Sequence, residues 1–277
     1  MDGELGRLAA ARFGEPCALD RACTEALLSP GKRVRPILLL LVGELFRVPP
    51  ERGLGLGAVI ESVHTASLIL DDLPSMDDAA TRRGRPALHR VHGEAVAILA
   101  AFRLLSVAHA ALPAALERAG VPRARRTGEV TALAGVVERL CRGQELDLAA
   151  RATTVDELET IHASKTGALF ELAVRWGALA GRPSAGEEAA VLAYARNLGL
   201  AFQVVDDVLD AVGDPEVMGK PAGKDAGRVT FVGLLGVEGA RKLARELVEA
   251  AVAALEPFGP GAGPLAALAR GVVDRAA

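Results

Sequence analysis

Apolar residues recur along most of the chain at intervals of three and four positions, which is the spacing of one face of an α-helix. β-branched residues form no alternating runs, and aromatic residues make up only 3% of the sequence, so the pattern gives little support for strands. Segments rich in proline and glycine separate the apolar runs, as expected of turns between helices. The pattern predicts helices over residues 18–28, 33–46, 53–72, 93–118, 124–149, 155–180, 186–212, 236–256 and 263–275.

Two of these predicted helices begin with a capping pattern. Thr154 and Ser184 are each followed three positions later by a glutamate, so hydroxyl and carboxylate can bond each other's free backbone amides. No linker rich in serine and glycine and no sharp change of composition divides the chain. We therefore expect one all-α domain over residues 1–277. The longest break, near residues 213–230, is rich in glycine and charge and is interpreted as a functional loop.

The overall composition argues against several classes of protein. The net charge of −3 is unfavourable for a nucleic-acid-binding protein. The three cysteines have no CxxC spacing, so they indicate neither a disulfide framework nor a zinc site. The charge-free apolar stretches are interpreted as too short for a membrane span, and the first residues lack the features of a signal peptide. We expect a cytoplasmic protein without a membrane span.

Two clusters of aspartate, far apart in the chain, carry most of the functional information. The first lies in the segment from Leu68 to Asp78 and the second in the segment from Phe202 to Asp210. Burying so many like charges beside apolar helical surface is costly unless cations neutralise them. Mg²⁺ prefers oxygen ligands and is commonly shared between carboxylates and substrate phosphates. The clusters predict a Mg²⁺-dependent enzyme acting on diphosphates, with the candidate metal ligands Asp71, Asp72, Asp77, Asp206, Asp207 and Asp210.

Helical spacing groups further polar side chains with these clusters. Asp206, Asp210 and Gln203 share one face of a predicted helix, and His64 shares a face with Asp71. Basic residues occur in two short segments near the clusters, and arginine and lysine can bind diphosphate directly. Two metal-binding groups and two cationic groups suit a cleft that holds two diphosphates. The basic residues are Lys32, Arg35, Arg82 and Arg83.

With these residues the sequence resembles the trans-isoprenyl diphosphate synthases, the polyprenyl synthetase family. The resemblance runs from about Ala26 to the C-terminus and keeps the motifs in order, which makes it specific. It implies a single-domain antiparallel helical bundle around a central cleft. The segments that carry it are Gly31-Lys-Arg-Val-Arg-Pro36, Asp71-Asp-Leu-Pro-Ser-Met-Asp77, Arg82-Arg-Gly-Arg-Pro86, Gly143-Gln-Glu-Leu-Asp147, Lys165-Thr166, Asp206-Asp-Val-Leu-Asp210 and Gly219-Lys-Pro-Ala-Gly-Lys-Asp225.

The resemblance also implies a mechanism and a role for each group. Mg²⁺ held by the aspartates would stabilise the departing diphosphate of an allylic substrate, which leaves an allylic carbocation. The double bond of isopentenyl diphosphate would attack this cation in a cleft closed to water. The implied catalytic residues are Asp71, Asp77, Asp206 and Lys165; the implied contacts of the allylic diphosphate are Arg82, Lys165, Thr166, Gln203 and Lys220; and those of isopentenyl diphosphate are Lys32, Arg35, His64 and Arg83.

The length of the product is expected to depend on the helix that ends near Asp71. The growing chain would run back along this helix, where one turn of about 5.4 Å matches about one isoprene unit. Short-chain relatives with this longer aspartate motif usually carry an aromatic ring at the position of Ala66. Ala66 and Ser67 leave the pocket open, which favours a product of about twenty carbons, geranylgeranyl diphosphate, with about fifteen, farnesyl diphosphate, as the alternative. Phe102 and Phe170 are other candidates for the floor of the pocket.

Other assignments stay open at this point. A class I terpene cyclase also ionises allylic diphosphates, but it would leave the cationic segment starting at Gly31 unexplained. A head-to-head synthase of the squalene type lacks that segment, and a non-catalytic partner subunit typically loses one aspartate cluster. The resemblance further implies a homodimer. The expected partners are therefore isopentenyl and allylic diphosphates and a second copy of the chain.

Overall fold

A computed structural model describes residues 1–212 and 229–274, and nearly all of them lie in helices. The sheet in this part of the chain is one two-stranded hairpin. The all-α fold class is therefore confirmed. The elements are α1 (Asp2–Arg12), α2 (Ala18–Leu27), α3 (Val34–Leu45), α4 (Pro50–Asp71), β1 (Thr81–Arg82), β2 (Arg85–Pro86), α5 (Leu88–His92), α6 (Glu94–Arg118), α7 (Arg123–Leu148), α8 (Val155–His162), the π-helix η1 (Ala163–Gly167), α9 (Ala168–Leu179), α10 (Ala185–Val212), α12 (Phe231–Ala253), the 3₁₀-helix η2 (Glu256–Ala262) and α13 (Gly263–Val273).

The predicted helices correspond to observed helices, and both predicted capping boxes are confirmed. The Glu157 amide donates to the Thr154 hydroxyl at 3.2 Å, and the Glu187 amide donates to the Ser184 hydroxyl at 3.3 Å. The pattern does not predict α1, α5 or the hairpin. Within α1 only Leu5 and Ala9 are buried, so too little apolar periodicity marks this helix in the sequence.

Two predicted helices differ from the structure in their course. The helix predicted over 155–180 is interrupted by η1, which carries an extra residue per turn and so changes the direction of the side chains that follow. The helix predicted to begin at 236 begins earlier, because the Thr230 hydroxyl accepts a hydrogen bond from the Gly233 amide at 3.0 Å. Gly236, with a φ of 71°, interrupts the helical backbone there, which explains the later predicted start.

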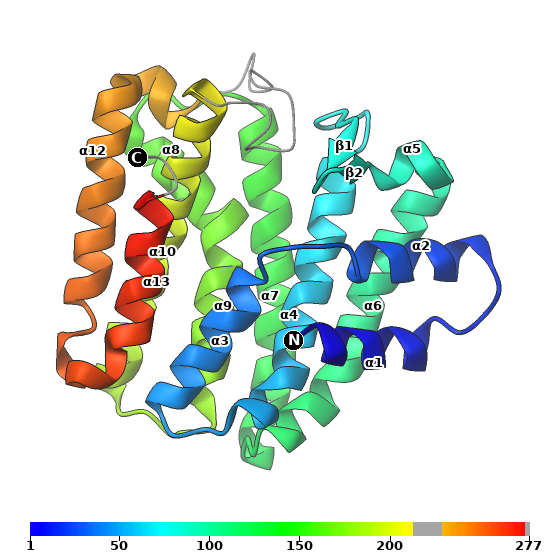
Figure 1. Ribbon diagram of the computed structural model, residues 1–277, viewed down its shortest axis with the longest axis horizontal. Helices are drawn as coiled ribbons and strands as arrows, with labels where there is room; N and C mark the ends of the chain where they lie inside the picture. Colours follow the sequence, from blue (N-terminus) through cyan, green and yellow to red (C-terminus); the bar gives the residue numbers. More distant parts are fainter. Residues whose placement is uncertain (213–228, 275–277) are drawn as a thin grey trace.

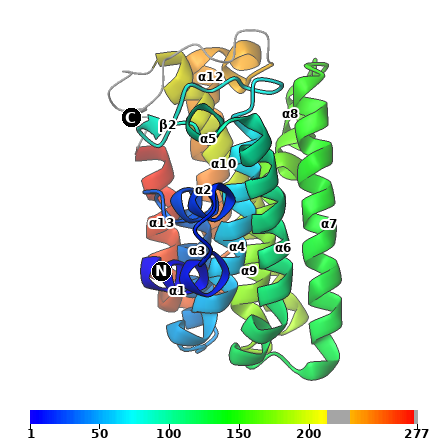
Figure 2. The ribbon, with the colours of Figure 1, turned by 90° about the vertical axis from the view of Figure 1, so that its right-hand side faces the viewer.

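Helix α4 contributes to two of the three apolar clusters of the bundle. Val59 and Val63 pack with residues of α6, α7 and α9, whereas Ala66 and Ile69 pack with residues of α1, α2 and α6. The third cluster joins α3, α8, α9, α10, α12 and α13. Successive long helices run in opposite directions, and α1 and α2 lie across the outside of the bundle (Figures 1 and 2). The arrangement is the expected antiparallel bundle, while the single domain over residues 1–277 stays a prediction.

The C-terminal ends of α4 and α10 lie at the same end of the bundle, at the top of Figure 1. The hairpin β1–β2 and the beginning of α12 lie at this end as well. Since α4 and α10 carry the two aspartate clusters, the fold brings both clusters to one end of the molecule.

The hairpin is closed by a tight turn. Arg82 pairs with Arg85, so Arg83 and Gly84 form a two-residue loop, with φ values of 53° and 72°. Two positive φ values are typical of a type I′ turn, the form that matches the twist of paired strands. Arg83 therefore holds a backbone conformation that residues with a side chain rarely adopt.

Among the described residues, α4 and α6 have the length and the apolar composition of a membrane span. Both helices contain charged residues, among them Glu61 in α4 and Arg103 in α6, so the charge-free stretches remain as short as the sequence indicates. The criterion is weak, because core helices of globular proteins also meet it, and 67% of the most apolar window of α4 is buried inside the protein. The corresponding window of α6 is 39% buried, so part of its apolar surface faces outward.

Candidate active site

The first aspartate cluster closes the C-terminal end of α4. The Asp77 amide donates to the Asp71 carbonyl at 2.9 Å, and the Ala79 amide donates to the Asp72 carbonyl at 3.1 Å, so the loop folds back over the helix end. These bonds satisfy carbonyls that a helix end leaves free. The spacing of the motif thus brings Asp77 beside Asp71. Burial raises the pKa of Asp71 to about 6, and the neighbouring charges of Asp77 and Asp72 act in the same direction.

The other two aspartates of this cluster contact arginines. Arg82 of β1 donates to both carboxylate oxygens of Asp72, with Nε 2.9 Å from Oδ1, and Asp72 is buried. Asp78 accepts a hydrogen bond from Arg90 Nη2 at 2.6 Å. The hairpin therefore brings Arg82 next to the metal-binding motif, as the sequence predicts. Asp72 already has a protein partner, and its assignment as a metal ligand stays a prediction.

The second cluster, on α10, divides into two parts. Asp207 is buried and accepts hydrogen bonds from Gln203 Nε2 and from the Phe231 amide, both at 2.9 Å. Asp207 therefore ties α10 to the first residue of α12, and its metal-binding role stays a prediction. Asp206 and Asp210 lie one turn apart on a common face of α10. The Oδ1 atom of Asp210 is buried and has no hydrogen-bond partner among the described atoms.

The π-helix η1 carries two predicted site residues. Lys165 Nζ donates to Oδ2 of the buried Asp147, on α7, at 2.6 Å. Thr166 Oγ1 donates to Gln203 Oε1, on α10, at 3.3 Å. The charge of Lys165 acts to lower the pKa of Asp71, so this lysine lies near the first aspartate cluster. Through η1 the structure therefore connects α7 and α10 with the end of α4.

Arg35 and His64 form another part of the site. Arg35 Nη1 donates to His64 Nε2 at 3.2 Å, and the guanidinium lies 4.7 Å from the ring centre of Phe170. Burial, together with nearby arginines, lowers the pKa of His64 well below its ordinary value. The ring is therefore neutral at physiological pH and accepts through Nε2. Burial lowers the pKa of Arg35 to about 10, against the opposing charges of Glu61 and Asp206.

These interactions bring together most of the residues predicted for the site. Asp71, Asp77, Arg82 and Lys165 are neighbours, while Asp206 acts through its charge on Arg35. The other contacts described above link Thr166 with Gln203 and Arg35 with His64. Lys32 is exposed just before α3, and Lys220 lies outside the described residues.

The residues present fit a divalent metal ion. Burial raises the pKa of Asp71, so a nearby cation would stabilise its charged form. The Oδ1 atom of Asp210 is buried and lacks a hydrogen-bond partner in the described part of the chain. No three His, Cys, Asp or Glu side chains among the described residues converge into a ready metal site. Oxygen atoms of a bound diphosphate would therefore have to complete the coordination, as is common for Mg²⁺.

Two buried acidic residues of this region had no role predicted from the sequence. Asp147 ends a sequence motif, but its pairing with Lys165 depends on the packing of η1 against α7. Glu61 is 1% exposed and contacts Arg33 and Arg83. The only sequence signal for Glu61 is a single charge within an otherwise apolar part of a predicted helix.

The close approach of α7 to η1 gives a test of how the site is positioned. A methyl group added at Gly143 would lie 2.4 Å from the backbone nitrogen of Lys165. Gly143→Ala should therefore displace η1, lower turnover at least about tenfold, and lower the free energy of unfolding by about 1–3 kcal/mol. Steady-state kinetics and thermal unfolding measure the two effects.

Gly135→Ala is the matched control on the same helix, because its added methyl group would meet nothing within 4 Å. This control should keep full turnover and unfold at the same or a higher temperature. Full activity of Gly143→Ala would show that the position of Lys165 does not depend on this contact.

Comparison with known proteins agrees with this geometry. The sequence profile of the family described as Polyprenyl synthetase matches residues 17–256. Geranylgeranyl pyrophosphate synthase 9, chloroplastic, of Arabidopsis thaliana is 39% identical over 278 residues, which cover 94% of this chain and 75% of that protein. Farnesyl diphosphate synthase of Escherichia coli (strain K12) is 43% identical over 231 residues, which cover 79% of this chain and 75% of that protein.

A solved structure leads to the same conclusion. The geranyltransferase from Helicobacter pylori, complexed with magnesium and isoprenyl diphosphate, superposes with a TM-score of 0.81 at 28% identity. The superposition covers 98% of this chain and 94% of that chain. The family profile matches most of this chain, and the two relatives are 39% and 43% identical to it. The chain therefore belongs to the polyprenyl synthetase family and is a trans-prenyltransferase.

Proposed function

We propose that this prenyltransferase condenses isopentenyl diphosphate with an allylic diphosphate in a Mg²⁺-dependent, head-to-tail reaction whose main product is geranylgeranyl diphosphate. The observation that carries the proposal is the convergence of carboxylates and cations at one end of the bundle, where Asp71 lies beside Asp77, Arg82 and Lys165. The names of the relatives and the magnesium bound to the Helicobacter pylori structure support it. A cytoplasmic location is part of the proposal and rests on the sequence alone.

Each group has a defined task in this reaction. Asp71, Asp77, Asp206 and Asp210 would hold Mg²⁺, which supplies positive charge to the diphosphate that leaves the allylic carbon. Lys165, oriented by Asp147, donates to the same diphosphate. The bond between the allylic carbon and the diphosphate oxygen breaks. The double bond of isopentenyl diphosphate then attacks the allylic carbon and forms the new carbon–carbon bond. A proton is then lost from the isopentenyl part, with the released pyrophosphate as the nearest acceptor.

The two diphosphates are held by different groups of residues. Arg82 and Lys165 lie beside Asp71 and serve the allylic diphosphate. Arg35 and the neutral His64, together with Arg83, serve the diphosphate of isopentenyl diphosphate. Because His64 carries no charge, it adds a hydrogen bond without adding to the repulsion between the arginines.

An assay with labelled isopentenyl diphosphate and each allylic diphosphate tests the proposal. Asp71→Asn and Asp206→Asn should each lower turnover by about 10²-fold or more, because a neutral amide cannot offset the charge of the metal and the leaving group. Circular dichroism should show an unchanged helical fold. Asp156→Asn, at an exposed position of α8, is the control and should keep normal turnover.

Two results would contradict the assignment. Near-normal turnover of either active-site variant at saturating Mg²⁺ would remove the proposed metal site. Conversion of an allylic diphosphate into cyclic products without chain growth would indicate a terpene cyclase instead.

The product chain is expected to extend from Asp71 along α4. Ala66 is fully buried in the cluster that α4 shares with α6, and Ser67 is partly exposed. Phe102 is 63% exposed on the outer side of α6, so it does not close the interior of this chain. Phe170 lies beside Arg35, at the level of the diphosphate sites rather than below them. Small side chains therefore line the first turn below the metal-binding motif.

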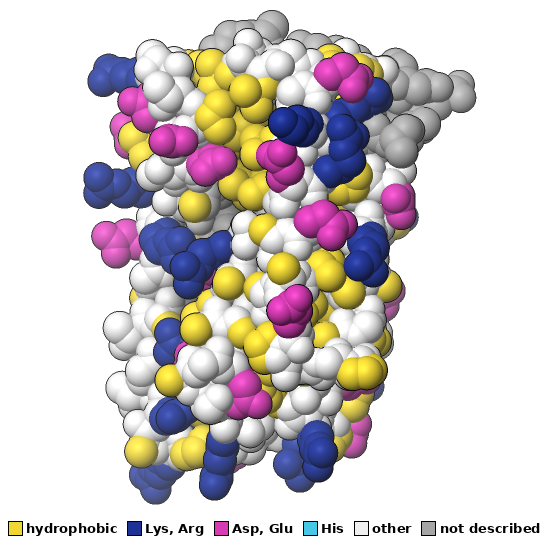
Figure 3. Space-filling model, turned by 90° about the vertical axis from the view of Figure 1, so that its left-hand side faces the viewer, with side chains coloured by type: hydrophobic (Ala, Val, Ile, Leu, Met, Phe, Trp, Pro, Cys, Tyr) yellow, Lys and Arg dark blue, Asp and Glu magenta, His cyan; other side chains and the backbone are white. Residues whose placement is uncertain are grey.

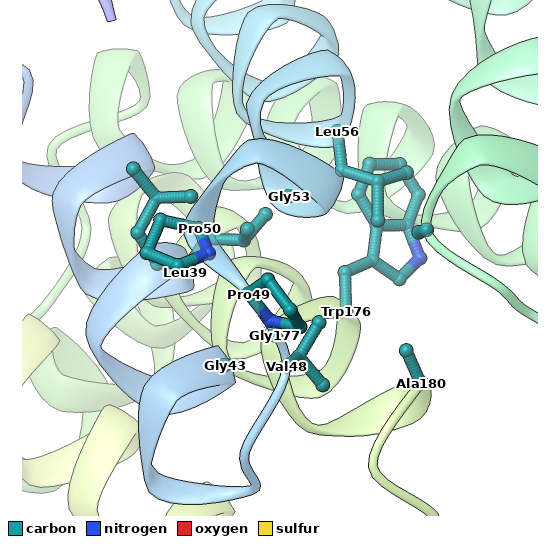
Figure 4. Close-up of a pocket in the computed structure, with 12 residues that line it drawn as sticks. Leu39, Gly43, Val48, Pro49, Pro50, Gly53, Leu56, Trp176, Gly177 and Ala180 are labelled. Carbon is teal, nitrogen blue, oxygen red and sulfur yellow. The ribbon is translucent and has the colours of Figure 1, made fainter.

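A small apolar cavity lies near the other end of α4. Its volume is about 10 Å³, and it lies where the ends of α3, α4 and α9 meet, beside Leu56 and Trp176 (Figure 4). Trp176 is fixed there, because its Nε1 donates to Glu129 Oε2 at 2.9 Å. Between Leu56 and Asp71 the helix rises about 22 Å, the length of about four isoprene units. This distance supports a product of about twenty carbons.

A bulky side chain at the first turn tests the proposed product length. Ala66→Tyr should shorten the main product by about one isoprene unit, because the ring occupies the space of one helical turn and cannot share it with a longer chain. Ala66→Ser, which adds a single oxygen, should keep the distribution of the unaltered enzyme. Chromatography of the dephosphorylated products measures both. An unchanged distribution in Ala66→Tyr would show that the floor of the pocket lies elsewhere.

We also propose a homodimer through α6. Ile98, Leu99 and Phe102 are 36%, 55% and 63% exposed, and their spacing places them on one side of this helix. On the face seen in Figure 3, which includes α12, charged side chains of both signs are spread among apolar ones. A run of large exposed apolar residues on one helix is typical of an interface, and a second copy related by a two-fold axis would cover it.

Light scattering of the purified protein tests the dimer. The unaltered chain, of 28.7 kDa, should give twice its mass at micromolar concentration. Phe102→Glu should shift the protein toward the monomer, because an ionised carboxylate cannot be buried in an apolar interface without a partner. Leu235→Glu on α12, where the native side chain is 39% exposed, is the control and should stay dimeric. A monomeric unaltered chain would contradict the proposal.

A further inference from the structure

A buried carboxylate joins two arginines beside the predicted site of isopentenyl diphosphate. Glu61, in α4, is 1% exposed, and its Oε1 accepts a hydrogen bond from Arg33 Nη1 at 2.6 Å. The same oxygen lies 3.6 Å from Arg83 Nη2. Arg33 precedes α3 and Arg83 lies in the hairpin turn, so Glu61 connects three segments that are distant in the sequence.

The segment between α2 and α3 holds both arginines from the other side. Arg33 Nη2 donates to the Ser29 carbonyl at 2.7 Å, and Arg83 Nη1 donates to the Ser29 hydroxyl at 3.3 Å. A methyl group at Gly31 would lie 2.7 Å from Arg83 Nη1, so this guanidinium packs directly over the glycine backbone. The position of Arg83 is therefore defined before any substrate binds.

The backbone of both arginines is unusual. Arg33 has a φ of 49° and Arg83 a φ of 53°. Residues with a side chain rarely adopt this left-handed conformation, and such strain concentrates at sites where function fixes the geometry. Glycine would fit both positions without strain but would lose the contacts with Glu61.

Glu61 is also the largest opposing charge for Arg83 and Arg35, while Arg33 contacts Asp2 as well, with Nε 3.0 Å from Oδ1. Burial lowers the pKa of Arg83, and the negative charge of Glu61 is the largest effect that opposes this lowering. The charge of Glu61 is likewise the largest effect that opposes the lowering of the Arg35 pKa by burial. Without an anion nearby, Arg33, Arg35 and Arg83 would repel one another and move apart.

We propose that Glu61 is a positioning residue for the diphosphate of isopentenyl diphosphate. Glu61 holds Arg83 and, through Arg33, the segment that carries Lys32 and Arg35 in the geometry that receives this group. Arg83 also lines an open cavity of about 60 Å³. The inference rests on the proposed function. About 15 Å of α4 separates Glu61 from Asp71, so the allylic diphosphate is not expected to depend on it.

Glu61→Gln separates positioning from simple charge. If Glu61 acts only through its charge, removing it leaves the site more positive, and the KM for isopentenyl diphosphate should fall. If Glu61 positions the arginines, the KM for isopentenyl diphosphate should rise about tenfold or more, with kcat and the KM for the allylic substrate changed less than about threefold. We expect the second result. A lower or unchanged KM, or an equal loss in all three constants, would overturn the proposal.

A matched control comes from another buried glutamate. Glu129 is 3% exposed and accepts a hydrogen bond from Arg175 Nη2 at 2.8 Å, and it lies about 27 Å along α7 from Asp147. Glu129→Gln should lower the unfolding temperature without a selective change in the KM for isopentenyl diphosphate. The same selective change in this control would show that any loss of a buried ion pair produces it, and would overturn the proposal.

A second variant and a binding measurement complete the test. Arg33→Lys keeps the charge but loses the planar fork that reaches both Glu61 and Ser29, so it should raise the KM for isopentenyl diphosphate selectively by at least about threefold. This variant decides the question if Glu61→Gln does not fold. Calorimetric titration of isopentenyl diphosphate without an allylic substrate measures binding alone, and weaker binding to either variant is expected. Absence of turnover by the unaltered enzyme would instead refute the proposed function.

Discussion

A charge inside an apolar helical bundle must be compensated by a partner. This requirement explains most of the contacts at the end of the bundle that carries the candidate active site. Four buried carboxylates at or near this end have partners within the protein. Asp72 pairs with Arg82, Asp147 with Lys165, Glu61 with Arg33 and Arg83, and Asp207 with Gln203 and the Phe231 amide. Each of these carboxylates also links two elements, Asp207 through the Phe231 amide of α12, so the contacts that compensate the charges also position the elements relative to one another.

Among the described residues, two other aspartates differ from these four carboxylates. Burial raises the pKa of Asp71, and one oxygen of Asp210 has no partner among the described atoms. These two residues, at the ends of α4 and α10, are the groups that a divalent cation and a diphosphate would satisfy. Under the proposed function, the aspartate-rich motifs would therefore contain members that link elements of the structure and members that bind a ligand.

Local patterns in the sequence are enough to predict most of the helices and both capping boxes and to reveal the two aspartate clusters, because each depends on residues a few positions apart. The features that the sequence does not predict depend on contacts between distant segments. The π-helix η1 becomes apparent only where Gly143 of α7 packs against Lys165, and the pairing of Asp207 requires the start of α12. Glu61 shows the same limit, since its partners come from the start of α3 and from the hairpin.

The hairpin turn has a consequence for the distance between the two reactants. Arg82 and Arg83 are adjacent in the sequence, yet one contacts Asp72 and the other approaches Glu61, because the left-handed backbone at Arg83 turns its side chain in another direction. Neighbouring Cα atoms are about 3.8 Å apart, so under the proposed function a single peptide unit would link the anchor of the allylic substrate to that of isopentenyl diphosphate. A change of turn type would therefore shift one reactant relative to the other without altering any group that touches either of them.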